Sequence, residues 1–389
     1  MKGGTCAGFL RERMINNFTW YIPTMVMFGK GLAQKIGDQI ASVGAKKIML
    51  IMGGQSAYKS GAYEQVSQSL KKNRIEFIEI VGVKSNPHVE LVREAIARLA
   101  VTPVDVIVPV GGGSVFDTAK AVAAGAKYNG DIWDLVKGKS PITKTLPVMG
   151  VLTASATSSE MNNIAVLTNH KTEEKISFTS PLLYPKLSII DPELQYTLPE
   201  RQTVAGGIDI MAHVMERYFE GNEVPELLFE QYEVYLRSML RCIPELRANP
   251  RNYDARAEYA WIATLSHNGS LSYGLKNRGD FSSHKLGHAL SLFYDISHGD
   301  SISIMMPSWI EYVSKFNPVP LERFTKNIMG LDELRSTFRS WGAPITLREI
   351  KVRENDIERI ADNVAKLAPM GTIKTLERED IIEIIKIAW

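Results

Sequence analysis

Residues 104–124, VDVIVPVGGGSVFDTAKAVAA, decide the fold class of this chain. An apolar, β-rich run leads into Gly111, Gly112, Gly113 and Ser114, and a run typical of a helix follows. Glycines let a backbone pass close to an anion, Ser114 can cap the helix, and a helix N-terminus offers unpaired N–H groups to phosphate. This order predicts a phosphate-binding βα unit, although neither the GxGxxG nor the P-loop pattern is present. A tight turn without a ligand is the alternative.

The alternation of strands and helices continues on both sides of this turn. Strands are predicted at 47–52, 77–81, 104–110 and 146–153, separated by helices at 63–72, 89–100 and 115–126. This pattern predicts βαβ units and a mostly parallel sheet.

From about Leu198 onward only helical patterns remain. They cover 203–220, 225–242, 254–274, 282–294, 301–316, 355–367 and 377–388. Pro192 and Pro199 bracket the change, so we place a boundary near residue 197. The predicted domains are an α/β nucleotide-binding domain, 1–197, in which 1–13 form an extension, and an all-α metal-binding domain, 198–389.

Composition excludes several classes of protein. The 389 residues contain 45 Lys+Arg and 43 Asp+Glu, a net charge of +2, which gives no broad field for nucleic acid or an anionic membrane. No run approaches the roughly 18 apolar residues of a membrane span. Cys6 and Cys242 lie too far apart for a thiolate metal motif and do not form a disulfide framework. We expect a cytoplasmic protein without nucleic-acid or membrane partners.

A second glycine pair ends the strand predicted at 47–52. Gly53, Gly54 and Ser56 are followed closely by Lys59. In dinucleotide sites an acidic residue at the end of an early strand bonds the ribose 2′-OH, whereas a 2′-phosphate requires that carboxylate to be absent. A small residue, a hydroxyl and a nearby cation suit a phosphate, and an ordinary loop is the alternative.

Three of the seven histidines lie within 15 residues of one another: His284, His288 and His298. Upstream, Asp209 and His213 have the i,i+4 spacing that places two side chains on one helix face, and His284 and His288 repeat that spacing. Imidazole and carboxylate ligands suit Zn²⁺ or Fe²⁺, so the group predicts a divalent metal site. A core or surface role is the alternative for any one of them, and it is our assignment for His88, His170 and His267.

Two longer stretches carry a family resemblance. Residues 191–216 include DPELQYTLP and GGIDIMAHVME, and residues 284–299 include HKLGH and YDISHG. With these stretches, the chain resembles the iron-containing (group III) alcohol dehydrogenases, in particular the butanol dehydrogenase and broad aldehyde reductase branch. The resemblance starts near Asn16 and continues to the C-terminus. It implies an α/β dinucleotide-binding domain and a helical domain with a cleft between them.

The resemblance also selects among the candidate ligands. Asp209, His213, His284 and His298 match the four metal ligands of the family, whereas His288 matches a histidine near the reaction centre. We therefore assign His288 a catalytic role in proton transfer. Spacing alone does not separate His288 from His298, and Fe²⁺ and Zn²⁺ both remain open.

Cofactor contacts are carried over in the same way. The residues that match nucleotide-binding positions are Gly111, Gly112, Gly113, Ser114, Asp117, Thr153, Thr157, Asn162 and Lys175. Ser158 stands where relatives often have Gly, which matters if φ is positive there. Relatives that use NAD often have Asp at the position of Gly53, so the Gly53, Gly54 and Ser56 loop predicts NADP(H) in preference to NAD(H).

The expected function is reversible hydride transfer between NAD(P)(H) and a small primary alcohol or aldehyde such as butanol or butanal. The resemblance also implies a homodimer, and Trp261, Phe281 and Phe293 are candidates for the walls of the substrate pocket. The alternatives are a polyol dehydrogenase of the glycerol type, a lyase-like relative of dehydroquinate synthase and a non-catalytic nucleotide-binding protein.

Overall fold

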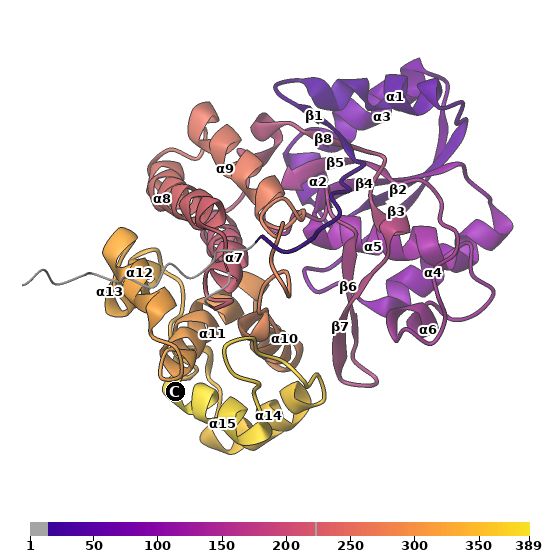
Figure 1. The fold of residues 1–389 in the computed structure, drawn as a ribbon. Coiled ribbons are helices and arrows are strands. Elements are labelled where there is room, and N and C mark those ends of the chain that lie inside the picture. Colours follow the sequence, from indigo (N-terminus) through magenta and orange to yellow (C-terminus); the bar gives the residue numbers. More distant parts are fainter. Residues whose placement is uncertain (1–14, 222–223) are drawn as a thin grey trace, which may run out of the picture.

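A computed structural model describes residues 15–221 and 224–389. It contains a parallel sheet with helices on both faces and a helical part, drawn on the right and left of Figure 1. This architecture confirms the predicted fold class. The extension expected at residues 1–13 lies outside the described residues.

The sheet has six strands in the order β1-β8-β5-β4-β2-β3, and all of its pairs are parallel. The strands are β1 Met25–Phe28, β2 Lys47–Met52, β3 Glu76–Val81, β4 Val106–Gly112, β5 Met149–Ala154 and β8 Leu187–Ile190. The four strands predicted from sequence are all present. The short strands β1, at the edge of the sheet, and β8, between β1 and β5, were not predicted.

Strand β2 explains why its sequence is apolar without alternation. Ile48, Leu50 and Met52 belong to one core cluster, and Met49 and Ile51 belong to another on the opposite face. The first face packs against α1 (Ile36–Ser42) and α3 (Ala62–Lys72). The second packs against α4 (Val89–Val101), α5 (Gly113–Gly125) and α6 (Ile132–Val136). A strand buried on both faces needs apolar residues at successive positions.

An antiparallel hairpin, β6 (Ile164–Asn169) and β7 (Glu174–Thr179), lies outside the main sheet and extends beside α10 in Figure 1. At its turn, Glu173 forms a salt bridge with Arg359 at 2.6 Å, and its carbonyl accepts a hydrogen bond from Asn363. Both partners lie on α14 (Ile357–Ala365). The hairpin therefore joins the sheet part to the helical part.

The helical part contains all seven predicted helices and two more. Its helices are α7 Glu200–Tyr218, α8 Glu226–Ala248, α9 Tyr253–Ser266, α10 Ser282–Tyr294, α11 His298–Val313, α12 Val319–Asn327, α13 Leu331–Ser340, α14 and α15 Arg378–Ile387. The helix predicted at 254–274 was too long: α9 ends at Ser266, and the chain then turns through Gly269 and Gly274, both with positive φ.

Short helices occur in both parts of the molecule. They are α2 Ser56–Lys59, η1 Leu32–Lys35, η2 Pro181–Leu183, η3 Pro192–Gln195, η4 Arg348–Ile350 and η5 Glu354–Asp356.

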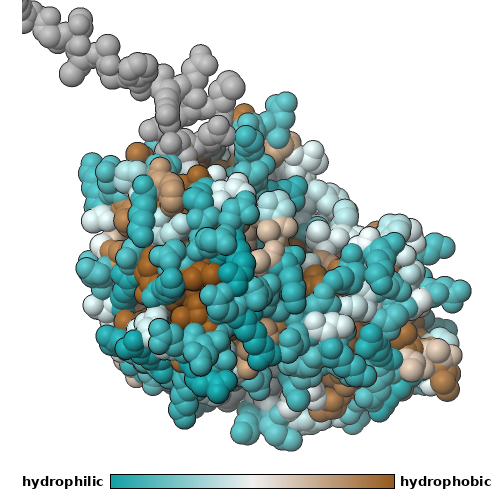
Figure 2. Space-filling model, turned by 90° about the horizontal axis from the view of Figure 1, so that it is seen from below, coloured by the Kyte–Doolittle hydropathy of each residue, from teal (hydrophilic) through white to brown (hydrophobic). Residues whose placement is uncertain are grey.

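Helix α7 lies at the centre of the molecule, with every residue from Thr203 to Tyr218 buried. In the described ranges, none of the helices has the length and apolarity that crossing a bilayer requires. The face seen in Figure 2 is mostly hydrophilic, with hydrophobic residues confined to small areas.

Buried polar contacts connect the two parts near Ser158, whose φ is +55°. The Ser158 hydroxyl donates to the carbonyl of Ala263 at 2.5 Å and accepts from the backbone N–H of His267 at 2.9 Å. Close by, the Thr264 hydroxyl donates to Glu160 at 2.6 Å. The φ of Ser158 is thus positive although the residue is not glycine, and these two hydrogen bonds hold its side chain in that conformation.

Candidate active site

A cavity of about 430 Å³ lies where the two parts meet. The sheet part and its hairpin contribute Ser114, Asp117, Thr157, Asn162 and Lys175, and the helical part contributes Asp209, His213, His284, His288 and His298. These ten residues were all singled out from the sequence, and the fold brings them to one cavity although they are spread over 185 positions (298 − 114 + 1).

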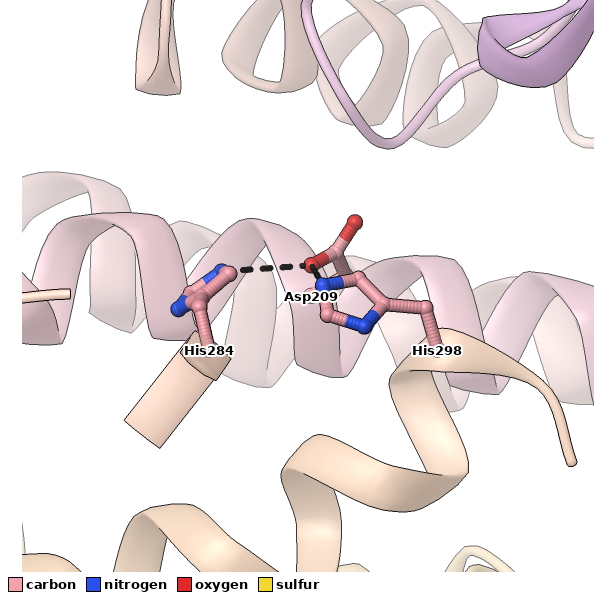
Figure 3. Close-up of side chains that lie close together, drawn as sticks. All are labelled: Asp209, His284 and His298. Atoms are coloured by element: carbon pink, nitrogen blue, oxygen red, sulfur yellow. Dashed lines mark ion pairs between the residues drawn. The ribbon is translucent and has the colours of Figure 1, made fainter. Parts of the chain in front are cut away.

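Three of the expected metal ligands converge from three helices. Asp209 lies on α7, His284 on α10, and His298 is the first residue of α11. Figure 3 shows both imidazoles directed at the same oxygen of Asp209. Nε2 of each histidine is 3.6 Å from Oδ1 of Asp209, and one potential ligand atom from each residue lies within 4.8 Å of the others.

The fourth expected ligand, His213, is close but less convergent. Its Nε2 is 3.7 Å from Oδ1 of Asp209, and its ring stacks on that of His284 with centroids 4.9 Å apart. It does not belong to the group of three within 4.8 Å. A small side-chain movement would be needed for all four residues to bind one ion.

The donor atoms of this group fit a metal ion. Oδ1 of Asp209 and Nε2 of His284, which face each other, are buried without a hydrogen-bond partner, whereas the unpartnered nitrogens of His213 and His298 are Nδ1, not the Nε2 atoms that face Asp209. Unpartnered buried polar atoms are costly, and a cation would satisfy those that point to it. Three imidazoles and one carboxylate are ligands that Zn²⁺ and Fe²⁺ both accept.

Burial also sets the protonation of the histidines. It lowers the pKa of His213, His288 and His298 well below the ordinary value, so these rings are neutral. Burial lowers the pKa of His284 too, but the carboxylates of Asp209 and Glu216 outweigh that effect and raise it to about 9, so a metal ion that binds this ring must displace a proton. Neutral imidazole is the form that binds metals.

The glycine turn lies where the sequence predicted it. The reason why glycine is needed there was not evident from the sequence. Gly111 and Gly112 end β4, and Gly113 begins α5. A Cβ on Gly113 would lie 2.1 Å from Oγ1 of Thr157, and one on Gly111 would lie 2.4 Å from the Val115 side chain. None of the three has a positive φ. Here glycine is required by close packing of the turn.

Ser114 does not cap the helix as expected. The N-cap position of α5 is Gly112, which has no side-chain bond, and the Ser114 hydroxyl donates to the carbonyl of Ser85 at 2.6 Å. Ser114 still lines the cavity at the N-terminal end of a 13-residue helix.

Asp117 and Asn162 belong to a buried network around Lys120, whose ammonium group donates to Ser159, Asn162 and the carbonyl of Ile164 at 2.8–2.9 Å. Asp117 accepts from Ser159 at 2.6 Å. Burial lowers the pKa of Lys120 to about 8. These contacts fix the cavity wall whether or not the same residues also touch a cofactor.

Lys175 on β7 reaches the cavity from the hairpin. Its Nζ donates to Oδ1 of Asn86 at 2.9 Å. Burial lowers its pKa to about 8, against the opposing attraction of Asp209 and Asp117. The hairpin, which was not predicted from the sequence, therefore positions a predicted site residue.

Gly53, Gly54, Ser56 and Thr153 lie along the same sheet edge, outside the lining of the described cavity. Gly53 directly follows β2, Ser56 begins α2, and Thr153 is buried in β5. Because parallel strands end at one edge, these residues and the glycine turn of β4 line the side of the sheet where nucleotides bind.

Sequence reasoning missed three residues at or beside the site. Glu216 accepts from Nδ1 of His284, and Arg217 donates to Nδ1 of His267. The His267 ring lies parallel to that of His213, with centroids 4.4 Å apart, and lines the cavity, so its assignment to a structural or surface role was incomplete. The spacing along α7 could have identified two of them. Glu216 is seven residues after Asp209 and Arg217 is four residues after His213, so each lies on the same helix face as that ligand.

Of the three aromatic residues expected in the pocket walls, Phe281 lines the cavity. Trp261 instead packs edge-on against Phe28, and Phe293 packs under the guanidinium of Arg359. Outside the cavity lining, His88 and His170 contact each other through their Nε2 atoms at 3.0 Å.

Comparison with known proteins gives consistent matches. Residues 23–192 match the family model "Iron-containing alcohol dehydrogenase", and residues 203–389 match "Fe-containing alcohol dehydrogenase family, C-terminal". The chain is 35% identical to the probable NADH-dependent butanol dehydrogenase 1 of Bacillus subtilis, covering 96% of this chain and 99% of that protein. It is 33% identical to the NADPH-dependent aldehyde reductase YqhD of Escherichia coli, covering 94% and 97%.

A solved structure supports the same grouping. The NADH-dependent butanol dehydrogenase A of Thermotoga maritima is 43% identical, with a TM-score of 0.94 over 96% of this chain and 99% of that one.

Proposed function

This chain belongs to the iron-containing alcohol dehydrogenase family, and from that premise we propose how its cavity carries out NAD(P)-dependent interconversion of an alcohol and an aldehyde. Asp209, His213, His284 and His298 hold one divalent cation, Fe²⁺ or Zn²⁺. The observation that carries the proposal is the convergence of Asp209, His284 and His298 within 4.8 Å. When bound, the cation supplies Lewis acidity toward the substrate oxygen, and the nicotinamide donates or accepts the hydride.

The residues of this chain bind, orient and exchange a proton. Ser114 and the N-terminus of α5 face the cofactor phosphates, and Lys175 faces the nicotinamide ribose. Neutral His288, whose ring centroid is 5.2 Å from that of His298, relays the proton that the substrate oxygen gains or loses. Asp117, Thr157 and Asn162 complete the cofactor side of the cavity.

For the cofactor we propose NADP(H) in preference to NAD(H). Gly53, at the end of β2, offers no carboxylate that would repel a 2′-phosphate, and Ser56 and Lys59 follow on α2. The named relatives include four NADH-dependent butanol dehydrogenases, at 33–36% identity, and an NADPH-dependent aldehyde reductase, at 33%.

We further propose a cytoplasmic homodimer. Strand β1 is at the edge of the sheet, and the segment before it exposes Phe18, Trp20 and Tyr21, each more than half accessible. An unpaired edge strand beside exposed aromatic residues favours pairing with a second copy. Light scattering after size-exclusion chromatography measures the assembly.

The test is a steady-state assay of butanal reduction by enzyme loaded separately with Fe²⁺ or Zn²⁺, with NADPH and with NADH. We expect turnover that depends on the metal and is abolished in His284→Ala, together with loss of metal content. The matched control is His170→Ala, in the turn of the hairpin, which should keep both the turnover and the metal content. Full metal content in His284→Ala would contradict the ligand assignment, and turnover of glycerol with none of butanal would favour the polyol dehydrogenase alternative.

A further inference from the structure

The cavity carries more positive charge than its two carboxylates balance. Its charged lining residues are Lys175, Arg217, Arg278 and Lys285 against Asp117 and Asp209. Asp117 is engaged by Ser159, and Asp209 is surrounded by histidines. A divalent cation on the four ligands would add further positive charge.

Three of these cations lie on the helical side. Arg217 follows the ligand His213 by one helical turn on α7, and Lys285 follows the ligand His284 directly on α10. Arg278 lies in the loop that leads into α10. The expected phosphate site, at the N-terminus of α5, belongs to the other side of the cavity. Lys175 is assigned to the nicotinamide ribose, which leaves Arg217, Arg278 and Lys285 without a role in cofactor binding.

Arg217 is a buried cation held by neutral groups. It is 2% exposed and donates to Ser272 at 2.7 Å, to Nδ1 of His267 at 2.9 Å, and to the carbonyls of His213 and Ser266. Among the described residues no carboxylate oxygen lies within 4 Å of its guanidinium. The second N–H of Nη2 has no acceptor in the described chain. Burying an unpaired charge is costly, and an anion in the cavity would offset that cost.

Arg217, Ser272 and Arg278 are contiguous. The Ser272 hydroxyl that accepts from Arg217 lies 3.3 Å from the carbonyl of Arg278 and can donate to it. Within residues 15–221 and 224–389, neither Arg278 nor Lys285 forms a salt bridge. Because Arg217 holds Nδ1 of His267 as an acceptor, the proton of this neutral ring is on Nε2, which adds a donor to the same wall.

We propose that the substrate carries a carboxylate at the end of its chain remote from the reacting carbonyl, so that the enzyme acts on short ω-carboxy aldehydes and the matching ω-hydroxy acids. This inference rests on the proposed function and specifies its substrate class. The carboxylate lies against the wall formed by Arg217, Arg278 and Lys285, while the carbonyl oxygen is at the metal ligands. Arg217 has one N–H left to offer a carboxylate oxygen, and the guanidinium of Arg278 can bond both oxygens through two N–H groups.

The test compares 4-oxobutanoate with butanal, which have the same number of carbons and differ by the carboxylate. We expect kcat/KM for 4-oxobutanoate to exceed that for butanal by at least tenfold, and the ratio to decrease as salt is raised. Lys285→Gln and Arg278→Gln should each lower the ratio at least fivefold, whereas Lys285→Arg should retain it. Lys276→Gln, an exposed lysine of the same loop outside the cavity lining, is the matched control and should leave the ratio unchanged.

Equal or better turnover of butanal would overturn this inference and leave the proposed function intact. A rise in the KM for NADPH in Lys285→Gln, with an unchanged substrate ratio, would also overturn it, since the cation would then serve the cofactor. Absence of turnover with both aldehydes, both cofactors and both metals would instead contradict the proposed function.

Discussion

Glu216 accepts a hydrogen bond from Nδ1 of His284 at 2.9 Å, on the opposite side of the imidazole from Nε2, which is 3.6 Å from Asp209. The same carboxylate accepts from the hydroxyl of Ser283 at 2.5 Å. When a metal ion displaces the second proton of this ring, the proton that remains on Nδ1 leaves the Nε2 lone pair free to bind the ion. Partners of this kind orient metal-binding histidines.

We expect Glu216→Ala to raise the dissociation constant for Zn²⁺ by about 10- to 100-fold, because His284 loses the group that fixes its tautomer and orientation. Competition with a chromophoric chelator measures this constant, and circular dichroism shows whether the fold is retained. Glu216→Gln keeps an acceptor and should lose less affinity. The control is Glu245→Ala, an exposed position on α8, and wild-type affinity in Glu216→Ala would contradict the positioning role.

Lys175 should make cofactor binding dependent on pH. Burial lowers its pKa to about 8, so it is charged below that pH and neutral above it. The KM for NADPH should therefore rise as pH increases from 7 to 9.5. A bound divalent cation repels the ammonium group and moves the same transition to lower pH.

Two variants separate this titration from others in the site. In Lys175→Arg the side chain stays charged from pH 7 to 9.5, so the KM for NADPH should depend less on pH than in the wild type. Lys175→Met should have a high KM at every pH. A wild-type profile in Lys175→Met would show that another group controls the pH dependence.

Gly53→Asp should move the cofactor preference toward NADH. A carboxylate at the end of β2 repels a 2′-phosphate and can bond a ribose 2′-OH. A Cβ at Gly53 meets only ordinary contacts, with the carbonyl of Val83 at 3.6 Å and Oγ of Ser56 at 3.7 Å. We expect the ratio of kcat/KM for NADPH to that for NADH to decrease at least tenfold, about 1.4 kcal/mol.

The matched control is Gly330→Asp, since Gly330 has a negative φ and open space around its Cβ position in the helical part. It should leave the cofactor ratio unchanged. A wild-type enzyme that prefers NADH would contradict the interpretation of Gly53.

Ser158 affects the free energy of unfolding in two opposing ways: its hydrogen bonds stabilise the fold, and its positive φ destabilises it. Ser158→Ala removes the hydroxyl that bonds Ala263 and His267, and should lower the free energy of unfolding by about 1–3 kcal/mol. Ser158→Gly removes the same bonds but relieves the left-handed backbone at φ +55°, so it should be more stable than the Ala variant by about 1 kcal/mol. Urea denaturation compares them, and an Ala variant at least as stable as the Gly variant would contradict this account.

Local patterns in the sequence predicted much of the fold. The apolar run of β2 and the alternation around it predicted strand and helix positions closely, because burial on both sheet faces leaves a strong local signal. The hairpin left a weaker one in β7, where the exposed Ser177 and Thr179 flank the buried Phe178, whereas β6 has no exposed residue. Helices α12 and α13 were missed for a similar reason: they are short, and each buries only two side chains, such as Phe324 and Phe338.

The candidate site was predicted through its ligand types, and its supporting residues were not. Asp209, His284 and His298 stood out because histidine is scarce and the spacing is helical. Arg217 and His267 did not, because their contact joins positions 50 residues apart and depends on how α7 packs against the loop after α9. The glycine turn was located correctly, but the need for glycine at Gly113 arises from Thr157, which the local sequence does not reveal.

The buried contacts from Ser158 and Glu160 to α9 bear on whether the chain can be divided. If the chain were cut near residue 197 and the fragments separated, Glu160, which is 1% accessible in the intact molecule, would become exposed. Thr264 would lose the carboxylate to which it donates a hydrogen bond. Separation would also expose the apolar cluster that Phe116, Leu152 and Ile190 form with Ala260 across the junction. Fragments 1–197 and 198–389 should therefore be recovered only when they are co-expressed, as a complemented pair.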